Sequence, residues 1–352
     1  MAITKLNMKS KKLSICMATF NRGKFIGETL DSILTQMDSR VELVVVDGAS
    51  PDNTPEVMAQ YLSRYPEIRY YREQTNSGVD ADYDKAVGYA KGEYCWLMTD
   101  DDLLRPGAIS RVLTELQGGQ DLVVVNAQIR NADLSEIFQE SLFKTCSDKQ
   151  YDLRDGESFF SEMTESLSFI GCVVIKRKLW LSRNRELYFG SLFVHVGVIF
   201  QQPLLSKIST VSERLIAIRY GNAMWTSRSF EIWMFLWPQL VWSFTGVSEH
   251  AKAHVCPREA WRSINKLIHF RVTGAYTLLE YQAFLSNRGS VLFRLIAYVI
   301  ALTPGALLNL LAILFLLTCR PSSKMGLSDA LRSRYSTAAG HTAARLLGVK
   351  TK

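Results

Sequence analysis

The chain contains the stretch Tyr94-Cys95-Trp96-Leu97-Met98-Thr99-Asp100-Asp101-Asp102, in which five apolar residues lead through Thr99 into three consecutive carboxylates. The apolar part has the length and composition of a buried strand. Three adjacent carboxylates repel one another unless a cation or hydrogen-bond donors compensate them. Hard oxygen ligands favour Mg²⁺ or Mn²⁺, which commonly bridge protein carboxylates to phosphates. The alternative, an acidic cap for a helix that begins near Pro106, needs only one aspartate.

Short apolar runs alternate with amphipathic helical stretches over residues 13–127. Apolar residues between Ile26 and Met37 recur every three to four positions, which predicts a helix with one buried face. The stretch Asp52-Asn53-Thr54-Pro55 is typical of a turn that starts a second helix, ending near Tyr65. This βαβα pattern predicts a mainly parallel α/β sheet with helices on both faces. The predicted strands are Leu13–Thr19, Val41–Asp47, Ile68–Tyr71, Tyr94–Met98 and Leu122–Asn126.

Polar residues follow three of these strands, at the carboxyl ends where a parallel sheet binds its ligands. Thr19-Phe20-Asn21-Arg22 closes the first strand, Asp47-Gly48-Ala49-Ser50 closes the second, and the aspartate triplet follows the fourth. Asn76-Ser77-Gly78 and the acidic stretch 80–84 form another polar loop, which is equally typical of a solvated helix start. We therefore expect one rim of the sheet to carry the chemistry.

Composition divides the chain into three expected parts: a domain over residues 1–225, an aromatic-rich helical segment over 226–290, and an apolar stretch with a basic tail over 291–352. The aromatic residues between Phe230 and Phe244 suit a membrane interface, a partner surface or an ordinary helix packed on the main domain. Residues 128–225 are less regular than the first half of their domain. Their predicted elements are a hairpin over Ile129–Phe143, a helix over Asp155–Thr164 and a strand over Cys172–Ile175. An apolar run over Leu192–Phe200 is not assigned to helix or strand.

The stretch 295–318 contains no formal charge and is long enough, as a helix, to cross a hydrocarbon core of about 30 Å. Pro304-Gly305 would kink such a helix, so a bent span, a hairpin that dips into one leaflet and two interfacial helices all remain open. After it, residues 320–352 carry seven Lys and Arg against Asp329 alone, which favours a cytoplasmic tail on anionic lipid. We expect a monotopic or re-entrant membrane anchor.

The overall charge balance favours a polyanionic partner, since 41 Lys and Arg against 34 Asp and Glu give a net charge of +7. A content of 47% hydrophobic residues excludes wholesale disorder. The six cysteines are spaced singly, which argues against a zinc or disulfide framework. Because no apolar signal core follows the basic stretch Met1–Lys12, we expect the catalytic part to lie in the cytoplasm.

These motifs resemble those of the cytoplasmic family 2 glycosyltransferases, which have the GT-A fold, a Rossmann-like mixed sheet that binds nucleotide-diphospho-sugars. The matching segments occur in family order over about residues 12–127, roughly a third of the chain. The triplet, with 78–83 and 94–97, is most similar to the abequosyltransferase-type enzymes of bacterial O-antigen assembly. The matching segments are Ser14–Arg22, Glu42–Thr54, Asn76–Gly78 and Gly92-Glu93-Tyr94 leading into the triplet.

The resemblance implies a nucleotide-sugar half over 12–127, an acceptor half over 128–225, and Mn²⁺ or Mg²⁺ as the cofactor. It implies that Thr19 and Asp47 hold the base and ribose, and that Asp101 is catalytic through the metal that bridges the diphosphate. The residues expected at the nucleotide-sugar are Thr19, Asn21, Arg22, Asp47, Ser50, Asn76, Asp80 and Asp100, and those expected at the metal are Asp101 and Asp102.

The implied reaction is attack of an acceptor hydroxyl on the anomeric carbon, with inversion, while metal and basic groups stabilise the departing nucleoside diphosphate. A general base must accept the hydroxyl proton, and the family's acidic pair has no clean match here. His195 stands at about the right place, as a base, an acceptor contact or a buried structural histidine. Weaker candidates for the base are Glu157, Glu162 and Glu165.

The leading hypothesis is a transferase that glycosylates a polyprenyl-diphosphate-linked oligosaccharide at the cytoplasmic face of the bacterial inner membrane, held by anionic lipid, with no nucleic-acid partner. A polyprenyl-phosphate glycosyltransferase would share the same motifs. A non-catalytic membrane scaffold would leave the carboxylate rim unexplained. The pair His250 and His254 has zinc-binding spacing but no third ligand, and the chain lacks GxGxxG, GxxxxGK[ST], HExxH and GxSxG.

Overall fold

The computed structural model describes residues 11–154 and 157–347, which form two compact units. The first unit contains the chain up to Arg219 and the segment Phe244–Ala251. The second contains Tyr220–Ser243 and the chain from Lys252. The division falls before the expected boundary at residue 225, and the aromatic and C-terminal parts, expected to be separate, share one unit.

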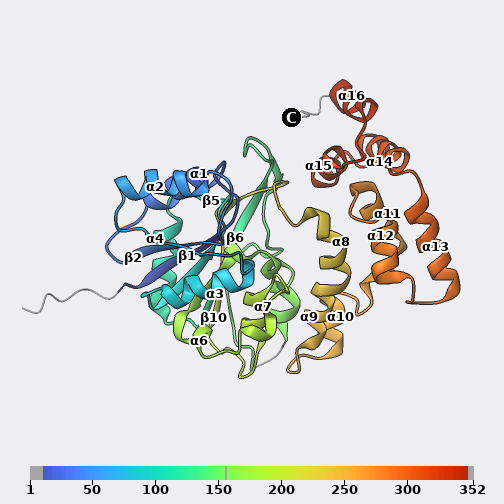
Figure 1. Ribbon diagram of the computed structural model, residues 1–352. Helices are drawn as coiled ribbons and strands as arrows, with labels where there is room; N and C mark the ends of the chain where they lie inside the picture. The colour runs from blue at the N-terminus through green and yellow to red at the C-terminus, as the bar shows by residue number, and fades with distance from the viewer. Residues whose placement is uncertain (1–10, 155–156, 348–352) are drawn as a thin grey trace, which may run out of the picture. The chain divides into compact units, whose positions relative to one another are not determined.

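The first unit is built on a ten-stranded mixed sheet flanked by helices (Figure 1). Its main path runs in the order β3-β2-β1-β4-β9-β6-β10-β5. The first four of these strands are parallel, as predicted, whereas β9 runs antiparallel to both of its neighbours. The strands are β1 Leu13–Thr19, β2 Val41–Asp47, β3 Arg69–Arg72, β4 Tyr94–Met98, β5 Leu103–Leu104, β6 Leu122–Arg130, β7 Ile137–Gln139, β8 Lys149–Tyr151, β9 Val173–Lys176 and β10 Ile208–Arg219.

The predicted ranges of β1, β2 and β4 agree with the structure, because these strands are buried at every position. A strand covered on both faces needs an unbroken apolar run, which is easy to recognise. Helix α1 presents Ile26, Leu30 and Ile33 to the core at the predicted spacing. The helices of this unit are α1 Ile26–Leu34, α2 Thr54–Arg64, α3 Val79–Tyr89, α4 Ala108–Glu115, α5 Ser158–Met163, α6 Arg177–Leu181 and α7 Val194–Phe200, with 3₁₀ turns η1 Leu116–Gly118, η2 Ser166–Ser168, η3 Ile170–Cys172 and η4 Glu186–Tyr188.

The second half of this unit differs more from the prediction. The expected hairpin is the antiparallel pair of β6 and β7, and the apolar element over Leu192–Phe200 is helix α7. The predicted helix over Asp155–Thr164 corresponds to α5, and its first two residues lie outside the described residues. Strand β10 was missed, because its register with β6 shifts between Val211 and Ile216, where exposed residues interrupt the apolar pattern.

The second unit is helical and has an aromatic core. Phe230, Phe270 and Tyr276 are buried together, and the ring centroid of Phe230 lies 5.6 Å from that of Phe270 and 4.8 Å from that of Tyr276. This burial supports the packed-helix interpretation of the aromatic segment. The elements are η5 Thr226–Arg228, α8 Ser229–Glu231, the π-helical η6 Ile232–Leu236, α9 Trp237–Ser243, α10 Glu249–Val255, which starts in the first unit, η7 Ala260–Arg262, α11 Ile264–Thr273, α12 Leu278–Glu280, the π-helical η8 Tyr281–Leu285, α13 Val291–Leu302, α14 Gly305–Cys319, α15 Lys324–Arg332 and α16 Ala338–Leu346.

The apolar C-terminal stretch forms two helices and not one. Among the described residues, no helix is by itself both long and apolar enough to cross a membrane. Helices α13 and α14 together have the length and composition of a span, but they meet at an angle of 89°.

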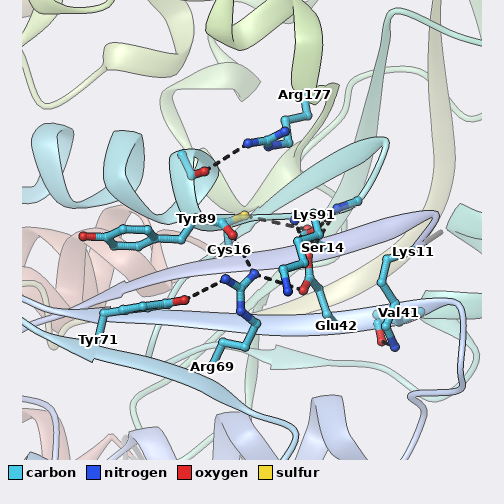
Figure 2. Close-up of polar contacts among 12 residues, drawn as sticks. Lys11, Ser14, Cys16, Val41, Glu42, Arg69, Tyr71, Tyr89, Lys91 and Arg177 are labelled. Carbon is cyan, nitrogen blue, oxygen red and sulfur yellow. Dashed lines mark hydrogen bonds and ion pairs between the residues drawn. The ribbon is translucent and has the colours of Figure 1, made fainter. Parts of the chain in front are cut away.

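A buried carboxylate, Glu42, connects the amino ends of the parallel strands (Figure 2). It accepts hydrogen bonds from the Ser14 hydroxyl at 2.6 Å and from the backbone N–H groups of Lys91 and Gly92, and Arg69 Nη1 lies 3.3 Å from its Oε2. Burial would raise the pKa of Glu42, but the hydrogen bonds from Ser14 and Lys91 and the charge of Arg69 hold it below its ordinary value. Glu42 therefore stabilises the fold as a carboxylate.

We predict that Glu42→Gln lowers the free energy of unfolding by about 1–3 kcal/mol at neutral pH, because buried donors lose a charged acceptor. The folded-state pKa of Glu42 is lowered, so its contribution is complete above the ordinary value of 4.5 and is lost as the pH falls through the folded value. Denaturant unfolding at several pH values measures this difference. Glu93→Gln, at an exposed ion pair with Lys12, is the control, and an equal loss in both variants would contradict the prediction.

Candidate active site

The carboxyl ends of β1 and β2 bring the first two predicted loops together. Thr19 is the register partner of Asp47. The backbone N–H of Asn21 donates to the Ser50 hydroxyl at 2.9 Å, and the N–H of Ser50 donates to Asp47 Oδ1 at 2.8 Å. Four of the residues expected at the nucleotide-sugar therefore form one connected rim.

A second buried carboxylate, Asp82, lies beside this rim. A Cβ atom at Gly48 would stand 2.6 Å from Asp82 Oδ2, so only glycine permits the approach. Burial is the largest cause that raises the pKa of Asp82, and the charge of Asp47 adds to the rise. The other oxygen of Asp47 accepts from the Tyr70 hydroxyl at 2.6 Å. In the sequence Asp82 belongs to a polar stretch that indicates no particular role for it, and Tyr70 shows no signal beyond that of a strand residue.

Arg22 faces the aspartate triplet from the loop after β1. Its Nε lies 3.3 Å from Asp100 Oδ1 and its Nη2 lies 3.4 Å from Asp101 Oδ2. Burial and the charge of Asp101 raise the pKa of Asp100 to about 7, and Arg22 and the Thr19 hydroxyl offset part of the rise. The guanidinium of Arg22 thus lies against two neighbouring carboxylates at this corner of the rim.

Asp102 has a different place from its two neighbours. Its Oδ1 accepts from the backbone N–H of Arg219 at 2.6 Å, and its Oδ2 accepts from the Thr99 hydroxyl at 2.6 Å. The side chain is buried, and burial and the charge of Asp101 raise its pKa. Since both carboxylate oxygens of Asp102 already accept hydrogen bonds from other residues of the protein, the geometry argues against the predicted role of Asp102 as a metal ligand.

The remaining carboxylates of the triplet, those of Asp100 and Asp101, suit a divalent metal ion whose other coordination positions are filled by a bound ligand. Within residues 11–154 and 157–347, no three His, Cys, Asp or Glu side chains are grouped so as to hold a metal ion. Mg²⁺ commonly takes only one or two protein carboxylates and fills its shell with water and substrate phosphates. Asp101, with Asp100 beside it, is the residue of this chain that would hold such an ion.

Asp80 does not line the rim as predicted. Its Oδ2 accepts from the backbone N–H groups of Gly190 and Leu192, both at 2.9 Å, and its Oδ1 accepts from that of Val194 at 3.1 Å. One turn later on α3, Asp84 accepts from the side chain of Arg185 at 2.7 Å. The first two turns of α3 therefore hold the segment that leads into α7, and the hydrogen bonds that Asp80 accepts come from this segment and not from the rim.

His195 lies in α7 but does not present a base. Its side chain is 1% exposed, and Nε2 lies 2.7 Å from the carbonyl oxygen of Leu167. Burial lowers the pKa of His195 to about 4, so the imidazole is neutral and shielded from an acceptor hydroxyl. The structure favours the buried-histidine interpretation.

The three weaker base candidates are also engaged elsewhere. Glu157 accepts from Ser248, Glu162 accepts from Lys149 and Tyr151, and Glu165 pairs with Lys144. Asn76 is exposed, and its side chain caps the N–H of Gly78 at 2.8 Å. None of these contacts brings the three glutamates to the triplet, whereas Asn76 Oδ1 lies beside the rim, 3.6 Å from where a Cβ atom at Gly48 would stand.

Arg219 is a residue of the site that the sequence analysis missed. It is buried at the end of β10, its Nε donates to the carbonyl oxygen of Asp101 at 3.0 Å, and its Nη2 binds Glu28. A lone arginine that ends an apolar strand was the available signal. Because β10 itself was not predicted, nothing placed that arginine beside the triplet.

The family follows from a direct comparison, in which residues 14–179 match the model described as glycosyl transferase family 2. These residues belong to that family. An abequosyltransferase from Salmonella typhimurium is 27% identical over 206 residues, which are 54% of this chain and 62% of the relative. A chondroitin synthase from Escherichia coli is 28% identical over 34% of this chain and 18% of its own length. The chain thus spans less than two thirds of the length of either relative.

Solved structures confirm the α/β fold predicted from the sequence. The TarS 1–349 structure from S. aureus, in complex with UDP, aligns with a TM-score of 0.56 and 16% identity over 91% of this chain and 89% of that one. A mannosyltransferase from Pyrobaculum calidifontis, in complex with GDP-Man and Mn²⁺, aligns with a TM-score of 0.51 and 16% identity over 96% and 88% of the two chains. At these identities the likeness establishes the fold alone.

We predict that Asp102→Ala destabilises the protein by about 2–4 kcal/mol, because the buried N–H of Arg219 and the Thr99 hydroxyl lose their acceptor. Asp101→Ala should cost much less, since it removes a repulsive charge next to Asp100. Denaturant unfolding of both variants checks the contrast. Equal stability of Asp102→Ala and wild type would contradict the structural role.

We predict that Asp80→Asn speeds hydrogen exchange at residues 190–194 by at least about tenfold, because a carboxamide cannot accept from all three N–H groups. Amides of β1 and β4 should exchange as in wild type. The control is Asp133→Asn, at an exposed turn carboxylate. Unchanged exchange at 190–194 would show that Asp80 does not hold this segment.

Proposed function

We propose that this protein is a metal-dependent glycosyltransferase that moves a sugar from a nucleotide-sugar donor to a polyprenyl-diphosphate-linked oligosaccharide, in the synthesis of O-antigen or a related bacterial cell-surface polysaccharide. The observation that carries the proposal is the rim itself. Asp100 and Asp101 pair with Arg22, and Asp47 ends the neighbouring strand β2, so all four stand at the carboxyl ends of parallel strands inside a family 2 domain. The similarity to an abequosyltransferase and a chondroitin synthase supports saccharide synthesis.

The residues of the rim suit the parts of such a donor. The carboxylates of Asp47 and Asp82 are acceptors for hydroxyl groups, and the loop from Gly48 to Ser50 positions them. Asp101 would hold the metal, which when bound supplies positive charge to the departing nucleoside diphosphate. Arg22 offers a second positive charge at the same corner, where it is held ready by the carboxylates.

The acceptor and the location are proposed from the second unit. Its helices α13 and α14 expose large apolar side chains, which a lipid-linked acceptor and a membrane surface would accommodate. The basic C-terminal region suits anionic lipid at the cytoplasmic face of the bacterial inner membrane. In this proposal the sugar acceptor reaches the enzyme from the bilayer.

We predict that one of UDP, GDP, CDP or dTDP binds the wild type in the presence of Mn²⁺ and that Asp101→Ala weakens this binding by at least about 100-fold, since a metal clamp on a phosphoryl oxygen is worth several kcal/mol. Calorimetry and thermal shift with and without Mn²⁺ measure it. The matched control is Asp133→Ala, which changes an exposed carboxylate outside the rim.

Two outcomes would overturn the proposal. Folded wild type that binds none of the four nucleotides would remove the transferase assignment. Equal turnover with bare polyprenyl phosphate and with the polyprenyl-diphosphate oligosaccharide, using the nucleotide-sugar of the base that binds, would overturn the acceptor assignment alone.

A further inference from the structure

Helices α13 and α14 form a bent pair (Figure 1), and both carry exposed large apolar side chains. On α13, Val291, Leu292 and Leu295 are between 57% and 74% exposed, and on α14, Leu311 and Phe315 are 53% and 50% exposed. Scattered exposed leucines are ordinary, but contiguous apolar patches on a protein surface mark an interaction site. We call the two helices with their connecting residues 303–304 the apolar hairpin.

The bend of the apolar hairpin is fixed by a buried arginine. Arg271 on α11 is 7% exposed, and its Nε and Nη2 donate to the carbonyl oxygen of Thr303 at 3.0 and 2.7 Å. Its Nη1 donates to the Tyr335 hydroxyl at 2.7 Å. The guanidinium therefore binds the backbone at the point where α13 ends, and Pro304, which has no N–H, directly precedes α14 as its N-cap residue.

A second polar side chain fixes α14 below the bend. Asn309 is fully buried, and its Nδ2 donates to the carbonyl oxygens of Val272 at 3.1 Å and Ala330 at 2.8 Å. Straightening the hairpin would remove the acceptors of a buried guanidinium and a buried amide, which is costly in either an apolar or a lipid environment. The bend is therefore a property of the fold.

Neither arm of the apolar hairpin is long enough to cross a bilayer alone. With 12 and 15 residues, the arms extend roughly 18 and 22 Å at 1.5 Å per residue, against a hydrocarbon core of about 30 Å. With the bend fixed, the two lengths do not add. The hairpin suits one leaflet of a membrane.

The basic residues around the apolar hairpin indicate which kind of membrane surface it would bind. Residues 281–328 contain four basic side chains and no Asp or Glu. Arg288 is exposed just before α13, and Arg320 and Lys324 are exposed just after α14. An apolar face with cations at both ends matches acyl chains bordered by anionic headgroups, whereas a protein partner or a second copy would not require this one-sided charge.

We propose that the apolar hairpin is a preformed wedge that enters a single leaflet of an anionic bilayer, with Arg271 holding its angle and Arg288, Arg320 and Lys324 binding lipid phosphates. This assignment deepens the proposed function, since it states how the enzyme meets a membrane-held acceptor. It is tested without donor or acceptor, so its failure is distinct from failure of the transferase assignment.

The first experiment is flotation of the purified full-length protein with vesicles of phosphatidylcholine alone or mixed with phosphatidylglycerol. We expect binding to the anionic vesicles that weakens with salt. The double change Leu295→Glu and Leu311→Glu should reduce binding by at least about tenfold. The matched control is Leu279→Glu, which alters a 73% exposed leucine on α12 outside the hairpin. Absence of binding to either vesicle, or equal loss in the control, would overturn the proposal.

The second experiment measures the bend. Nitroxides at Leu292 and Leu314 report the distance between the arms by electron spin resonance, with and without anionic vesicles. The wedge predicts an unchanged distance, and a longer distance on binding would mean that the hairpin straightens. Light scattering without lipid completes the test, because a stable dimer abolished by the two leucine changes would identify a second copy as the occupant.

Discussion

The parallel pairing of β1 with β2 on one side and β4 on the other is the constraint on which the site depends. The register sets Thr19 beside Asp47 and Met17 beside Met98, so three loops that are distant in sequence leave the sheet at one edge. At the opposite edge, Glu42 connects the same strands through Ser14 and Gly92. The geometry of the rim is therefore held from both ends of the strands.

The three adjacent aspartates of the triplet have different partners in the fold. Asp102 is buried against Arg219 and Thr99, where its carboxylate completes hydrogen bonds of the backbone and a hydroxyl. Asp100 and Asp101 instead share the guanidinium of Arg22. Adjacent buried carboxylates repel one another, and a positive charge beside them lowers that repulsion. Arg22 supplies such a charge to Asp100 and Asp101, and the proposed metal at Asp101 would add to it.

The sequence was most informative where burial is uniform. Strands β1, β2 and β4 coincide with the predicted ranges, because residues covered on both faces leave an unbroken apolar run. The alternating part of β10 is broken by a bulge with exposed residues, so no simple period identifies it. The roles of the aspartates are harder to predict, since Asp80 and Asp101 both stand in polar, acidic stretches of the sequence. What separates them is the backbone of Gly190 and Leu192, which only the folded chain brings to Asp80.

The close approach of Asp82 to Gly48 links two positions that are far apart in the sequence. Any side chain at position 48 would enter the space of the Asp82 carboxylate. Asp82 in turn is held by the Ser77 hydroxyl at 2.6 Å, so it cannot simply turn aside. Among descendants of this chain, a larger residue at 48 can therefore persist only together with a smaller one at 82, and the two sites should diversify as a pair.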